Sequence, residues 1–165
     1  MDRPVGEYIN ELIATARATF CDVQITRRDE RSARALIDME GWWGAYRIII
    51  SEIILPDGSI RYAYYVLDAD NQLVHGFDNT PDVRAVKLRY GREYRHHLGE
   101  RTPHQHTGDD RLSLTEPMTL ERFIEWLRRL LRFQRLREAA GDMPEDEALA
   151  LAQVVAEDVR HRRFF

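Results

Sequence analysis

The chain has 165 residues, of which 44% are hydrophobic and 32% charged, and its formal net charge is −4. This balance excludes wholesale disorder, and the length predicts a single domain over residues 1–165, which the elements described below make an α+β domain. No stretch approaches the roughly 18–20 apolar residues that cross a bilayer, and the first twenty residues do not resemble a secretory signal. Cys21 is the only cysteine, so we expect a cytoplasmic protein without disulfides or membrane association.

The first third of the chain predicts a helix followed by strands. Apolar residues recur at helical spacing over 5–18, and 19–27 alternates like a strand with Cys21 in the core. Residues 33–38 fit either a strand or a short helix. Gly and Trp residues at 41–44 predict a turn or bulge, and the isoleucine-rich stretch 45–55 predicts a central strand.

Two turns then predict an antiparallel meander. Pro56-Asp57-Gly58 is a hairpin signal, because proline fixes the bend and glycine accepts positive φ. The returning strand covers 60–68, and a second turn leads to a third strand over 72–77. The predicted sheet therefore has about four to five strands.

The remainder predicts a long polar segment and two helices. Residues 78–116 are weakly periodic, and a loop of this length is usually functional or flexible. Thr119 is a plausible N-cap for an amphipathic helix that ends near Gly141. Pro144 then starts an acidic helix, which we treat as a C-terminal extension (138–165) of the core (43–137). The predicted fold is thus a meander packed by one N-terminal and two C-terminal helices.

Charge is unevenly distributed along the chain. Residues 84–137 contain thirteen basic and seven acidic side chains, whereas 138–158 contain seven acids and no base. The basic part could attract phosphate and the acidic part could repel it or cover the basic surface. Two ordinary solvated helix faces would give the same pattern.

The segment Pro103-His104-Gln105-His106 is the sharpest candidate for chemistry. Two histidines two residues apart point the same way on an extended chain. They could share general acid and base catalysis on a phosphodiester, with His75 or Asp78 orienting them. They could instead bind a metal together with His75 and Asp78. A solvated or packing pair is the more common reason for such spacing.

Two neighbouring segments could assist these histidines. Asp78 and Asn79 end the third predicted strand, where such side chains often cap turns, and Asn79 could also donate to an anionic oxygen. The stretch 84–97 interleaves arginines with tyrosines, which suits single-stranded RNA, although an exposed loop would look similar. The expected RNA-binding side chains are Arg89, Arg92, Tyr94 and Arg95.

Several of these segments together resemble the TumE family of prokaryotic toxins. The resemblance is carried by the Asp57-Gly58-Ser59 hairpin, the aromatic strand 61–65, the Phe77–Pro81 turn and the Pro-His-x-His segment at 103–106, in that order. It covers about residues 43–131. The chain departs from the family at Asp82 and Val83, where histidine often follows the turn proline, and in the long insertion 83–101.

This resemblance implies the toxin of a type II toxin–antitoxin module, with a helix-turn-helix antitoxin as partner. We expect a histidine-dependent ribonuclease that uses no cofactor or metal, and homo-oligomers are compatible with it. Two alternatives remain open: a metal-dependent hydrolase using the histidine cluster, and a non-catalytic binding module. In the latter, the helix 119–137 would engage a partner through Trp126 or Phe133.

Overall fold

The computed structural model describes residues 4–31 and 34–141. The chain divides into two compact units, Met1–Phe123 and Ile124–Phe165, and each is described by itself. Among the described residues, no helix is long and apolar enough to cross a membrane. The first unit contains the sheet and all the residues discussed below as a candidate site.

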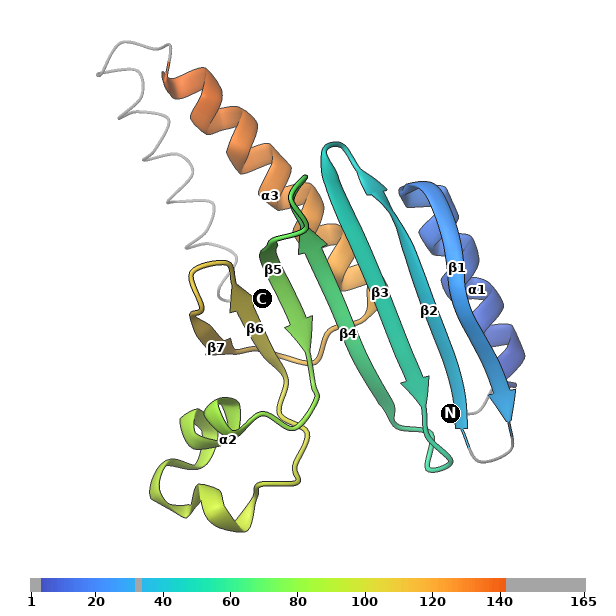
Figure 1. Cartoon of the computed structure of the whole chain (residues 1–165), viewed down its shortest axis with the longest axis vertical. Helices are drawn as coiled ribbons and strands as arrows, with labels where there is room; N and C mark the ends of the chain where they lie inside the picture. Colours follow the sequence, from blue (N-terminus) through green and yellow to red (C-terminus); the bar gives the residue numbers. More distant parts are fainter. Residues whose placement is uncertain (1–3, 32–33, 142–165) are drawn as a thin grey trace, which may run out of the picture. The chain divides into compact units, whose positions relative to one another are not determined.

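Seven antiparallel strands form one sheet, and each strand pairs with the strand that follows it in the chain (Figure 1). This topology is a meander, as the two turn signals predicted. The strands are β1 (Cys21–Arg31), β2 (Arg34–Trp43), β3 (Tyr46–Ile54), β4 (Ile60–Leu67), β5 (Leu73–Asp78), β6 (His104–Thr107) and β7 (Leu112–Leu114).

The N-terminal helix and the first turn of the last described helix cover one face of this sheet. α1 (Val5–Thr19) lies along β1 and β2 and buries Ile9, Leu12 and Ala16 (Figure 1). α3 (Leu120–Gly141) begins in the first unit, where the ring of Phe123 stacks on Tyr64 with centroids 5.2 Å apart. The strand alternation that turns Tyr64 towards this core turns its neighbours to the opposite face of the sheet.

One carboxylate is buried inside the helix-covered face. Glu52 of β3 is 1% exposed and accepts hydrogen bonds from the hydroxyls of Tyr8, at 2.6 Å, and Tyr64. Burial raises the pKa of Glu52, although both tyrosine hydrogen bonds act in the opposite direction. The two donors explain how an acidic side chain can occupy the core.

The α+β class and the meander are confirmed, but the predicted number of strands was too low. The ambiguous stretch 33–38 belongs to β2, and the turn after it falls at Gly44, whose φ is +61°. The predicted loop 78–116 contains β6, β7, a short helix α2 (Val83–Tyr90) and a 3₁₀ helix η1 (Gly91–His96). These elements are too short to give a clear periodic pattern.

Three further predictions concern single segments. Cys21 was expected in the core but is exposed, because it lies on the edge strand β1. The acidic helix expected from Pro144 lies outside the described residues. So does the side chain of Phe133, which we considered as a partner contact.

Candidate functional site

The pairing of β5 with β6 brings the aspartate and both histidines together. Asp78 lies opposite His104 in the register, and Gly76 lies opposite His106. Residues paired in this way share a face, as do residues two apart on one strand. The three polar side chains therefore meet on the face of the sheet opposite the Tyr64–Phe123 core.

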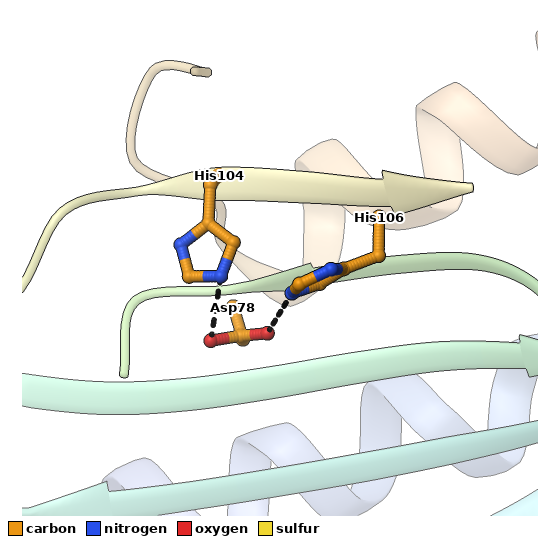
Figure 2. A group of neighbouring side chains, drawn as sticks. All are labelled: Asp78, His104 and His106. Carbon is orange, nitrogen blue, oxygen red and sulfur yellow. Dashed lines mark ion pairs between the residues drawn. The ribbon is translucent and has the colours of Figure 1, made fainter. Parts of the chain in front are cut away.

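The two imidazoles converge on the two oxygens of one carboxylate, as Figure 2 shows. The Nε2 atom of His104 lies 3.4 Å from Oδ1 of Asp78, and the Nε2 atom of His106 lies 3.3 Å from Oδ2. Asp78 is 2% exposed and His104 is completely buried, whereas the side chain of His106 is 19% exposed. Solvent therefore reaches this cluster from the side of His106.

Neighbouring groups hold the carboxylate of Asp78 in place. Its Oδ1 atom accepts hydrogen bonds from the backbone amide of Thr80 at 2.9 Å and from the Thr80 hydroxyl at 2.5 Å. Its Oδ2 atom lies 3.4 Å from the hydroxyl of Tyr65, which comes from β4. Asp78 thus caps the turn after β5, as expected, while also facing both histidines.

The buried imidazole of His104 is held by the backbone. Its Nδ1 atom lies 2.6 Å from the carbonyl oxygen of Thr102. A carbonyl only accepts, so Nδ1 carries a proton and donates it. Its other ring nitrogen, Nε2, is buried and has no hydrogen-bond partner among the described residues.

Tyr65 is a neutral donor at this site. Burial, followed by the charge of Asp78 and the hydrogen bond to it, raises the pKa of Tyr65 to about 12. Its hydroxyl therefore stays protonated at neutral pH and can donate to the carboxylate.

His75 lies on the other face of the sheet and does not join the cluster. It is paired with Thr107, and its Nδ1 atom lies 3.1 Å from Nε2 of Gln105. Burial lowers the pKa of His75, and the charge of Asp109 opposes that shift. The side chain lines a surface hollow of about 820 Å³ that does not include Asp78, His104 or His106.

Asn79 is bonded within the sheet. Its Nδ2 donates to the carbonyl of Ile60 at 2.9 Å, and its Oδ1 accepts from the amide of Tyr62 at 2.9 Å. Both ends of the amide extend the pairing beyond the end of β5. The expected contact of Asn79 with an anionic oxygen would require breaking these bonds.

The basic and aromatic residues form a helical insertion rather than an extended path. α2 and η1 lie between β5, which carries Asp78, and β6, which carries both histidines. Asp82 caps α2 through the amides of Arg84 and Ala85 and lies within electrostatic range of the His104 side chain. The insertion therefore begins beside the cluster.

The predicted RNA-binding side chains lie on the surface of this insertion. The guanidinium carbon of Arg95 lies 5.9 Å from the ring centroid of Tyr94, and that of Arg89 lies 5.6 Å from the centroid of Tyr90. Arg92 is exposed on η1. All three arginines are accessible to solvent, and Arg89 and Arg95 each lie over a tyrosine ring.

Asp78, His104 and His106 are also a possible metal-binding group. Each offers one ligand atom, and these atoms lie within 4.8 Å of one another.

Sequence reasoning predicted these three residues but missed Thr80, Thr102 and Tyr65, which hold them. The alternation of β4 predicted that Tyr65 lies on the other face of the sheet from Tyr62 and Tyr64. Only the pairing of β4 with β5 shows that the face of Tyr65 also carries Asp78.

No family model matches the sequence, and no curated protein or solved structure is significantly similar to it. The resemblance to the TumE family therefore stays a prediction.

Proposed function

We propose that this chain cleaves RNA at the centre formed by Asp78, His104 and His106. The supporting observation is the convergence of one carboxylate and two imidazoles on a sheet face that solvent reaches beside His106. Such groups are the usual means of moving protons and stabilising charge during phosphodiester cleavage.

The substrate class is supported by the insertion that joins the two strands of this centre. Arg89, Arg92 and Arg95 are exposed there, and Arg89 and Arg95 lie beside tyrosine rings. Arginines contact phosphates and aromatic rings stack on unpaired bases, so this surface suits a single strand. RNA also supplies its own nucleophile in the 2′-hydroxyl group.

The reaction would proceed by attack of the 2′-oxygen on the adjacent phosphorus. The bond from phosphorus to the 5′-oxygen breaks, the 2′-hydroxyl loses its proton, and the leaving 5′-oxygen gains one. The products are a 2′,3′-cyclic phosphate and a 5′-hydroxyl end. His106 is the accessible member of the centre, whereas His104 is buried and acts without touching RNA.

In a cell, this activity would make the chain a toxin. The resemblance to the TumE family supports this role and supports a helix-turn-helix antitoxin as the partner. Co-expression with the product of an adjacent reading frame should then restore growth. If no neighbouring gene product relieves growth arrest, the toxin–antitoxin proposal loses its support.

The cleavage proposal is tested with purified full-length protein and a single-stranded RNA oligonucleotide. We expect His106→Ala to lower the cleavage rate by about 10²–10⁴-fold, the range typical of proton-transfer groups. His75→Ala is the matched control, because His75 lies on the opposite face of the sheet from the cluster. A 2′-deoxy substitution at the cleaved linkage should abolish cleavage.

Equal activity of the His106→Ala and wild-type proteins would contradict the proposal. Loss of cleavage in His75→Ala would contradict it as well. If wild-type protein cleaves no RNA while still arresting growth, a non-catalytic binding module becomes the better account.

A further inference from the structure

We propose that Asp78, His104 and His106 together bind one divalent transition-metal ion. The binding of the ion is argued from geometry alone. Only its role in RNA cleavage rests on the proposed function. It replaces the expectation that the two histidines share proton transfer without a metal, and it excludes His75 from the ligand set.

The first argument is the hydrogen bonding of His104. Its Nδ1 donates to the carbonyl of Thr102, so Nε2 is the ring nitrogen left to bind a ligand. Nε2 is buried, has no hydrogen-bond partner among the described residues and faces Oδ1 of Asp78. A cation bound between this nitrogen and the carboxylate would satisfy both buried groups.

The second argument is distance. If that cation were a proton, a charge-assisted hydrogen bond would draw nitrogen and oxygen to about 2.7–2.9 Å. The observed separations are 3.4 Å for His104 and 3.3 Å for His106. Ligand bonds of about 2.0–2.1 Å in a tetrahedron place neighbouring ligand atoms about 3.3–3.4 Å apart, which is the separation of each imidazole nitrogen from its own oxygen of Asp78. One ligand atom from each of the three residues lies within 4.8 Å of the others.

The third argument is the support around the ligands. Metal-bound histidines usually donate their other nitrogen to a carbonyl or carboxylate, and metal-bound carboxylates are themselves hydrogen-bonded. Thr102 supplies that carbonyl for His104, and Thr80 donates twice to Asp78. Tyr65 adds a hydroxyl beside the other carboxylate oxygen.

The ligand types indicate which ions would bind. Two imidazoles and one carboxylate suit zinc and other first-row divalent ions, whereas magnesium and calcium prefer oxygen ligands. Three protein ligands leave a position for water or substrate, as in catalytic zinc sites. The partial exposure of His106 provides access to that position.

Such an ion would supply the chemistry that the proposed cleavage needs. Held by Asp78, His104 and His106, the ion would supply a coordinated water made more acidic by the metal, beside the position that RNA would occupy. The ion would also stabilise the negative charge that develops on the phosphoryl oxygens. The histidines would then hold the metal and would not exchange protons with RNA.

Zinc binding to metal-free full-length protein is the test, measured by calorimetry and by the visible spectrum of the cobalt-substituted form. We expect one ion per chain in the wild type. We expect an affinity loss of at least about 100-fold in Asp78→Asn and His106→Ala, because even supporting residues are worth about 10–100-fold. His75→Ala and His96→Ala should bind as the wild type does.

Circular dichroism verifies that each variant is folded, and His106→Gln replaces any unfolded alanine variant. Absence of zinc binding in the wild type would overturn the inference. Zinc binding as tight as that of the wild type in both ligand variants would overturn it too. RNA cleavage by demonstrably metal-free protein would overturn the role of the ion in catalysis alone. Stoichiometric binding of zinc by a protein that cleaves no RNA would support the metal site and refute the proposed function.

Discussion

The ring of Tyr65 lies directly against Gly76, so that a β-carbon at position 76 would be 2.5 Å from Cδ1 of that ring. Tyr65 on β4 and Gly76 on β5 are paired in the sheet. The missing side chain leaves room for the ring, whose hydroxyl reaches Asp78. A glycine in the middle of a strand here reflects a close approach of neighbouring groups.

We therefore predict that Gly76→Ala destabilises the fold by about 1–3 kcal/mol, the usual cost of overpacking. Urea denaturation measures this cost. Gly99→Ala is the control, because a β-carbon at position 99 would meet no atom within 4 Å. In a Tyr65→Ala background the same Gly76→Ala change should cost little, and an undiminished cost there would contradict the explanation.

The pKa of Tyr65 predicts a change in stability at alkaline pH. Burial and the charge of Asp78 raise this pKa from 10.0 to about 12. Between these values the unfolded chain has lost the tyrosine proton and the folded chain has kept it, so stability falls as pH rises from about 10 to 12. Tyr65→Phe should reduce this fall relative to the wild type in urea denaturation at several pH values. Parallel profiles would contradict the assignment.

Glu52 predicts a change in the acidic range. Its pKa is raised above 4.5, chiefly by burial, so the folded chain keeps a proton that the unfolded chain loses. Stability should therefore fall as pH rises above about 4.5 and through the folded pKa. Glu52→Gln should lack this dependence and gain stability relative to the wild type as pH rises. A difference in stability between Glu52→Gln and the wild type that stays constant as pH rises would refute this assignment.

The two tyrosines that donate to Glu52 give a separate prediction. Glu52→Ala removes the acceptor for the hydroxyls of Tyr8 and Tyr64. A buried donor left without a partner costs about 1–3 kcal/mol, so thermal denaturation should show a clear loss of stability. Restoring part of that loss by adding Tyr64→Phe would identify the unpaired hydroxyl as the cause.

RNA affinity should depend on the charge of the insertion. Arg92→Ala combined with Arg95→Ala should weaken binding and lower the slope of log affinity against log salt by about 0.7 for each phosphate that an arginine no longer neutralises. Arg17→Ala with Arg27→Ala is a charge-matched control, because both arginines are exposed on α1 and β1, far along the chain from the insertion. Equal effects of the two pairs would show that only net charge matters.

The core strands could be predicted because their sequences alternate and their turns are explicit. Pro56-Asp57-Gly58 correctly predicted the β3–β4 hairpin, and the run of isoleucines correctly predicted β3. β6 could not be predicted in the same way, because its four residues include no apolar side chain. It becomes a strand through pairing with β5 and β7, which is a tertiary effect.

The candidate site shows the same division between local and tertiary information. Alternation correctly placed His104 and His106 on one face. Alternation along β5 also puts Asp78 and His75 on opposite faces, but only the register between β5 and β6 shows that Asp78 is the one that joins the histidines. Thr102 and Thr80 hold the site through backbone geometry, which leaves no pattern in residue types.

Anomalous diffraction at the zinc absorption edge, from crystals of the full chain grown with zinc, tests the central claim most directly. The account predicts a peak about 2.0–2.1 Å from the Nε2 atoms of both His104 and His106 and in contact with the carboxylate of Asp78. A fully hydrated cluster with no anomalous peak between these three side chains, in crystals that bind zinc elsewhere, would contradict it.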